Sequence, residues 1–161
     1  MCRPYRFKPL LAAFIFVVFS AETPSAAGVV FTQPINFGSI IAAPHGDTIE
    51  INAKNGPAQP VLFTSGNSII TGGGYSGIIR VASDIPGQTI NLVYPVSIVL
   101  EAAGAGGMTV DGIAQRSRTS ATSAAAEDID FDIGGLLHIA DGQKTQSYGK
   151  SMTVEVDVIN P

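Results

Sequence analysis

The segment Ser147–Asn160, S-Y-G-K-S-M-T-V-E-V-D-V-I-N, decides the fold class of this chain. Every second position of its second half is apolar, at Met152, Val154, Val156 and Val158. Side chains alternate between the two faces of a strand, so this pattern predicts one long strand with an apolar face and a charged face. A helix does not fit, because the period is two and the valines are β-branched. The rest of the chain must supply the apolar face against which this strand packs.

Short β-rich segments separated by turn residues recur through the rest of the chain. Strands are expected at 28–33, 35–41, 48–52, 61–63, 77–82, 89–94, 97–101, 108–110, 129–133 and 136–139. Turn signals such as Asn55-Gly56-Pro57 and Pro86-Gly87 separate them. Residues 114–126, rich in Ser, Thr and Ala, are expected to form an exposed loop with a ragged edge strand. The pattern predicts an all-β sandwich or barrel, with no helix of useful length after the N-terminal region.

Residues 1–27 are typical of a secretory signal peptide, expected to be helical. Three basic residues precede the apolar run Leu10–Phe19, and Ser25 and Ala27 place small residues at the positions that a signal peptidase reads. We expect cleavage between Ala27 and Gly28, and a protein secreted to the periplasm or cell surface. The alternative is an uncleaved membrane anchor, but the apolar run is about half of the roughly 20 residues that a spanning helix needs.

The charge of the mature chain narrows the classes of partner. Cleavage removes three of the nine basic and one of the thirteen acidic residues, which leaves a net charge of −6 on a single domain over residues 28–161. That excess of acid argues against nucleic acid and anionic membrane surfaces as partners. The only cysteine, Cys2, leaves with the signal peptide, so the mature chain has no disulfide, cysteine nucleophile or thiolate metal site.

Asp128, Asp130 and Asp132 are the sharpest candidate for a binding site. At period two they extend from one face of a strand, roughly 7 Å apart, and calcium takes several oxygen ligands of this kind. The calcium-loop pattern fails, because its sixth and twelfth positions hold Ile133 and Ile139 in place of Gly and Glu. The favoured interpretation is a solvated outer face whose like charges discourage edge-to-edge pairing.

Catalytic and cofactor motifs are not found, so we expect neither an enzyme nor a cofactor or metal site. The two histidines, His45 and His138, lie about ninety residues apart, without a metal-ligand spacing. The chain lacks a G-x-S-x-G elbow, and an S-x-x-K match at Ser147–Lys150 is expected by chance in a Ser-rich chain. Gly72-Gly73-Gly74 opens no helix and no Lys-Ser or Lys-Thr follows it, which argues against a phosphate-binding loop.

Four motifs occur in order along the chain: Ile35–Ile40, Gly77–Val81 followed by Gln88–Leu92, Met108–Val110, and the segment from Gly134 to the terminal strand. Together they make the chain resemble the exported bacterial proteins of domain-of-unknown-function family 4402. The last hairpin departs from the family, which usually has Gly two residues before and after the tyrosine, where this chain has Gln146 and Lys150. The resemblance implies an immunoglobulin-like or pilin-like antiparallel β-sandwich, similar to fimbrial and spore-coat-U-like subunits. It transfers no catalytic or binding residue.

The sequence therefore favours a secreted, non-enzymatic structural subunit of a bacterial surface appendage or coat. The alternative is a stand-alone adhesin or ligand-binding module. The expected partners are further copies of the chain or a periplasmic chaperone. If the protein polymerises, residues 28–41 are expected to form the assembly element, in which Val29, Phe31 and Gln33 share one face of an extended segment that could add to a neighbour's sheet. The competing interpretation is that these residues form the first strand of their own domain.

Overall fold

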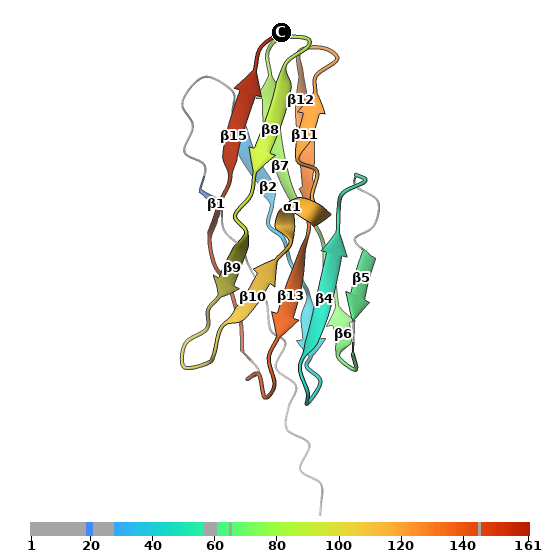
Figure 1. Ribbon diagram of the computed structural model, residues 1–161, viewed down its shortest axis with the longest axis vertical. Coiled ribbons are helices and arrows are strands. Elements are labelled where there is room, and N and C mark those ends of the chain that lie inside the picture. Colours follow the sequence, from blue (N-terminus) through green and yellow to red (C-terminus); the bar gives the residue numbers. More distant parts are fainter. Residues whose placement is uncertain (1–18, 21–27, 57–60, 65, 145) are drawn as a thin grey trace, which may run out of the picture.

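The computed structural model describes residues 19–20, 28–56, 61–64, 66–144 and 146–161 (Figure 1). The predicted signal peptide lies outside the described residues, except for Phe19–Ser20, which form a short strand rather than part of a helix. The described chain is all-β, as the sequence predicts, and every described sheet but one is antiparallel.

The strands and the single helix are β1 (Phe19–Ser20), β2 (Val29–Gln33), β3 (Ser39–Ile41), β4 (Asp47–Asn52), β5 (Val61–Thr64), β6 (Ile69–Gly72), β7 (Gly77–Ser83), β8 (Thr89–Val93), β9 (Ser97–Leu100), β10 (Met108–Asp111), α1 (Ile113–Arg116), β11 (Ser120–Thr122), β12 (Glu127–Ile133), β13 (Gly135–Ile139), β14 (Met152–Thr153) and β15 (Glu155–Ile159). All ten strands expected before the terminal segment are present. The sequence analysis missed β6, which pairs with β3, and the one-turn helix α1.

The strands form an elongated molecule with two layers. In the upper half of Figure 1, the sheet β11-β8-β15 lies in front of the sheet β12-β7-β2. The lower half contains the five-stranded sheet β5-β4-β13-β10-β9 and the pair β3-β6. One continuous cluster of buried side chains fills the interior, with Phe37, Phe131 and Leu137 among its fully buried members.

Gly134 joins the two halves, because the chain passes there directly from β12 to β13. β12 pairs with β7 along its whole length, whereas β13 pairs with β4 and β10 of the other sheet. A Cβ atom at Gly134 would lie 2.6 Å from the Arg116 carbonyl oxygen and would also collide with the Ile51 carbonyl oxygen. The Gly134 amide donates a hydrogen bond to Ser117 Oγ at 2.9 Å. Only glycine fits where a strand leaves one sheet for another at such close range.

Residues 114–126 contain the edge strand β11 and are mostly exposed, as expected, but three of their side chains are buried. Ser117, Ala121 and Ser123 are buried, and β11 pairs with β8. The small side chains of these three residues fit where the segment passes over the core, while most of the other residues face solvent.

The terminal segment alternates as predicted, but it is two strands instead of one. Met152 and Val154 are buried and Glu155 is exposed, so the apolar and charged faces are assigned correctly. The ladder is interrupted at Val154. β14 pairs in parallel with β1, and β15 pairs antiparallel with β8.

Candidate functional site

The predicted assembly segment, residues 28–41, contains β3 and, before it, the edge strand β2 of its own domain. The only neighbour of β2 among the described strands is β7, and the register shifts between Phe31 and Gln33. Val29, Phe31 and Gln33 are half-buried whereas Val30 and Thr32 are exposed, which confirms the expected faces. Side chains help to hold the strand: Gln33 Nε2 donates to the Ser76 carbonyl at 2.7 Å.

The last strand, β15, is also an edge strand, with β8 as its one neighbour among the described strands. Backbone polar groups of the even-numbered residues of β8 point toward β11, because the Leu92 amide donates to the Thr119 carbonyl at 2.8 Å and the Gln88 carbonyl accepts from Ser123 at 2.9 Å. In an antiparallel ladder, bonded and non-bonded pairs alternate.

The open side of β15 follows from that alternation. Val156 and Val158 lie opposite Leu92 and Ile90, the non-bonded pairs. Their amides and carbonyls therefore point away from β8, toward the edge of the sheet. We call this row of backbone groups at Val156 and Val158 the open edge.

The inward side chains of the edge strands β15 and β2 are incompletely covered. Val156 and Val158 pack against the core but are only half-buried, whereas Ile90 and Leu92 on the adjacent strand are buried. β2 shows the same half-burial in the opposite layer. Because β11 leads directly into β12 at one side, β15 and β2 both lie at the other, as Figure 1 shows. The inward side chains of both edge strands are therefore partly accessible.

A strand already pairs with the start of this terminal segment. β1 lies parallel to β14, with Phe19 opposite Met152 and Ser20 opposite Thr153. The terminal segment can therefore accept a strand that runs in its own direction.

The three aspartates of β12 do not share one environment. Arg80 donates two hydrogen bonds to Asp130, from Nε at 2.7 Å and Nη2 at 2.8 Å, and this partner lowers the pKa of that carboxyl group. Asp128 is exposed. Asp132, in contrast, is only 4 % exposed, so its assignment to a solvated face is wrong.

Burial raises the pKa of Asp132, and the charge of Asp130 raises it further, while Arg118 and a hydrogen bond from Ser76 act in the opposite direction. A cleft of about 400 Å³ borders this strand and is lined by Arg118, Thr122 and the acidic residues of β12. Within the described ranges, no three His, Cys, Asp or Glu side chains are arranged to hold a metal ion. The Arg80 and Arg118 side chains instead balance part of the acidic charge.

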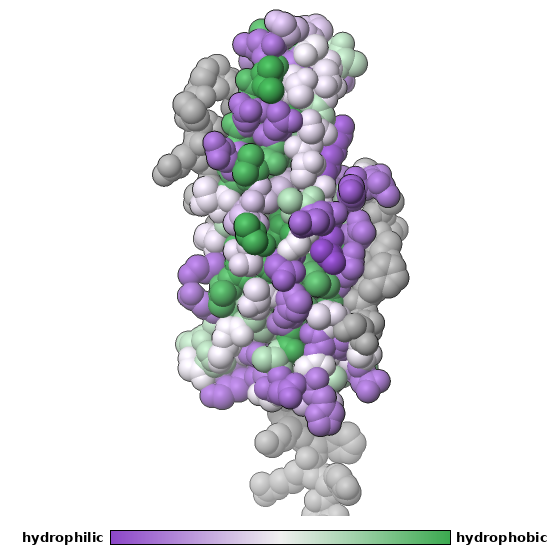
Figure 2. Space-filling view, viewed as in Figure 1, coloured by the Kyte–Doolittle hydropathy of each residue, from purple (hydrophilic) through white to green (hydrophobic). Residues whose placement is uncertain are grey.

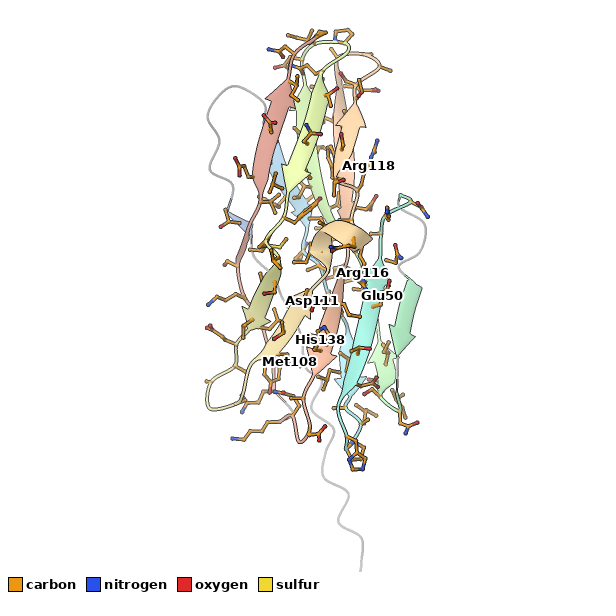
Figure 3. All side chains as sticks on the ribbon, viewed as in Figure 1. Glu50, Met108, Asp111, Arg116, Arg118 and His138 are labelled. Atoms are coloured by element: carbon orange, nitrogen blue, oxygen red, sulfur yellow. The ribbon has the colours of Figure 1, made fainter. Side chains whose placement is uncertain are left out.

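The other residues considered from the sequence have structural partners. His138 Nε2 lies 3.0 Å from Asp111 Oδ2 on the outer face of the five-stranded sheet (Figure 3). In the S-x-x-K match, Lys150 Nζ bonds to Glu101 Oε1 at 2.8 Å. Tyr148 is buried in the last hairpin, where its hydroxyl donates to the Lys144 carbonyl at 2.9 Å.

A second ion pair on that face was not found from the sequence. Arg116 Nε lies 3.2 Å from Glu50 Oε1, and both side chains are about three-quarters covered (Figure 3). Only the turn of α1 brings Arg116 over β4. Sequence spacing alone carries no signal of a pair whose members lie 66 residues apart.

Apolar side chains are exposed over β8 and β9 and the loop between them. Figure 2 shows hydrophobic patches along this face, and the exposed residues there include Val93, Val96 and Val99. Val96 is 89 % exposed and borders a cleft of about 380 Å³ that Tyr94, Pro95 and Ile113 also line. The cleft is therefore apolar on one side, with Asp111 among its other lining residues.

Comparison with known proteins gives one match. The family described as Domain of unknown function (DUF4402) matches residues 29–158. Neither a curated protein nor a solved structure matches the chain. Among the described residues, no helix is long and apolar enough to cross a membrane.

Proposed function

The chain belongs to the family described as Domain of unknown function (DUF4402), and from that premise we propose that it is a secreted, non-enzymatic structural subunit of a bacterial surface appendage or coat. We infer that its two layers form an immunoglobulin-like, pilin-like sandwich. The two layers of antiparallel strands and their shared core support this assignment.

The pair of edge strands β2 and β15 carries the functional assignment. Natural proteins protect sheet edges against pairing with other chains, and an uncovered edge is a template for association. Here the inward valines of both edge strands remain half-exposed. Glu155 and Asp157 give β15 some protection against pairing with itself, because two such acidic strands repel each other. The partly exposed edge and its acidic side chains therefore favour association of β15 with an uncharged strand rather than with another copy of β15.

We propose Gly28–Gln33 as the segment that one copy donates to the next. It carries no charged side chain and presents apolar residues at alternate positions. It is held in its own sheet by β7 alone among the described strands. Backbone hydrogen bonds from such a segment supply affinity, and its alternate side chains supply specificity.

Deletion of Gly28–Gln33 from the exported protein tests this function. If the segment is donated, the truncated protein melts cooperatively but forms no polymers under conditions in which the intact protein does. The matched control is Thr32→Ser, a small change on the exposed face of β2, which should leave polymer formation unaltered. A truncated protein that still forms fibres contradicts the assembly role. If the truncated protein instead loses cooperative melting, Gly28–Gln33 serves only as a strand of its own domain.

The alternative function is a stand-alone adhesin or ligand-binding module. The cleft beside Val96 favours it, because an exposed apolar residue next to a concave surface is typical of binding sites. Sedimentation of the purified exported protein separates the two: an adhesin remains monomeric at concentrations at which a subunit polymerises.

A further inference from the structure

The open edge of β15 has the features of an acceptor site, and this inference rests on the proposed function. We propose that the open edge accepts Gly28–Gln33 of a second copy, which adds to the sheet as a strand parallel to β15. The donated strand would extend the sheet β11-β8-β15 and cover the half-buried side chains of Val156 and Val158.

The direction of the added strand follows from the pairing that already exists. β1 runs parallel to β14, immediately before β15 in the sequence. Met152, Val156 and Val158 are in the same alternating set, so a strand that continues this pairing meets the backbone groups of the open edge, which have no partner strand among the described residues. In the uncleaved chain, Phe19–Ser20 occupy the beginning of the site. Cleavage after Ala27 would remove them and leave the whole edge uncovered.

The acidic side chains of β15 determine which kind of strand can add to the open edge. Two copies of β15 paired antiparallel about a twofold axis at Asp157 would place the two Asp157 side chains opposite each other, and like charges at that position destabilise a sheet. Gly28–Gln33 has no acidic residue. In the parallel orientation its amino end lies toward Glu155, so the α-amino group of a chain that begins at Gly28 adds an attraction.

Donation requires that β2 first leave β7. β2 has a single neighbour among the described strands and an irregular ladder, which makes it a weakly held strand of the domain. The assembly should therefore be slow and dependent on concentration. A synthetic peptide of residues 28–33 does not have this barrier, so it provides a direct probe of the site.

Hydrogen exchange of individual amides in the exported protein provides the first measurement. The amides of Val156 and Val158 should exchange at least tenfold faster than those of Glu155 and Asp157, which face β8. Equal protection of the four amides in the free protein would overturn the proposal, because the edge would then be covered. The alternation itself provides an internal control.

Addition of the peptide provides the second measurement. It should slow exchange at Val156 and Val158 at least tenfold, while a control peptide with aspartate at positions 29 and 31 has no effect. The protein variant Val158→Pro, which lacks one edge-facing N–H, should weaken peptide binding at least tenfold. If this variant does not fold, the exchange data on the unaltered protein decide alone.

The outcomes separate this inference from the proposed function. Polymers that form without peptide protection of Val156 and Val158 would leave the subunit function intact and overturn the acceptor site. Peptide protection in a protein that never polymerises would support the acceptor site and contradict the subunit function. Absence of peptide binding up to millimolar concentration, or binding that protects only other strands, would overturn the acceptor site.

Discussion

Replacement of Gly134, the residue between β12 and β13, by alanine should destabilise the protein strongly. The new Cβ would lie 2.6 Å from the Arg116 carbonyl oxygen, inside the distance of any normal contact, and would collide with the Ile51 carbonyl oxygen as well. Both obstacles are backbone atoms, so a side-chain rotation cannot relieve the overlap. Ile51 is fixed by its ladder pairing with Gly135, and the Arg116 carbonyl accepts a 2.7 Å hydrogen bond from Ala53.

The magnitude follows from these contacts. Overpacking a close-packed site costs about 1–3 kcal/mol, and losing the buried Ala53–Arg116 hydrogen bond adds about 1–3 kcal/mol. The sum, about 2–6 kcal/mol, is a large part of the roughly 5–15 kcal/mol that stabilises a typical domain. At about 3–4 °C per kcal/mol for a domain of this size, the melting temperature should fall by about 6–24 °C.

Thermal denaturation followed by circular dichroism measures the effect, with Gly106→Ala as the matched control. A Cβ atom at Gly106 meets nothing within 4 Å. That substitution should therefore leave the protein unchanged or stabilise it by about 0.4–1 kcal/mol, because alanine restricts the unfolded chain. If Gly134→Ala melts within 2 °C of the unaltered protein, the account of Gly134 as the close-packed passage between the sheets is wrong.

Four further predictions concern the charges, the core and the N-terminus. Val154→Asp should unfold the domain or cost several kcal/mol, whereas Glu155→Lys should change its stability by less than about 0.5 kcal/mol. If thermal melts show the two substitutions to be equally damaging, the assignment of Val154 to the buried face and Glu155 to the exposed face is wrong. Because the pKa of Asp132 is raised in the folded state, its ionisation reduces stability as pH rises above the ordinary value of 3.8, so the advantage of Asp132→Asn over the unaltered protein should grow between pH 4 and 7 in urea titrations. Arg80→Ala should cost less than about 1 kcal/mol in the same assay, since both partners of its ion pair are exposed; a larger loss would show that the pair is structural. The exported protein should begin at Gly28 by mass spectrometry, and a mass that includes residues 1–27 would contradict cleavage.

Local pattern was sufficient to predict most of the strands, because burial on one face imposes a period of two. The terminal segment illustrates this, with Val154 buried and Glu155 exposed as its alternation predicts. Its division into β14 and β15 was not predictable, since the partners β1 and β8 come from distant parts of the chain. Alternation determines a face, but not which strand lies beside it.

The candidate site was harder to predict from the sequence than the strands, because its residues owe their environments to tertiary contacts. The three aspartates of β12 have the same spacing, yet Asp130 pairs with Arg80 and Asp132 is buried. The difference arises from the segment after α1, where the Arg118 amide donates to the Asp132 carbonyl at 3.1 Å. The open edge likewise required the register of β8 against both of its neighbours, which no sequence pattern provides.

The passage from β12 to β13 also determines how the molecule resists tension. The backbone from Glu127 to Ile139 runs along the long axis in Figure 1 and is bonded sideways to β7 in one half and to β4 and β10 in the other. A pull along that axis loads these ladders in shear, so that many hydrogen bonds must fail together instead of opening one by one. Forced unfolding depends on the height of the unfolding barrier, and shear loading makes that barrier high. A filament built from such units would behave as a chain of stiff links, and its weakest points under load would be the junctions between copies.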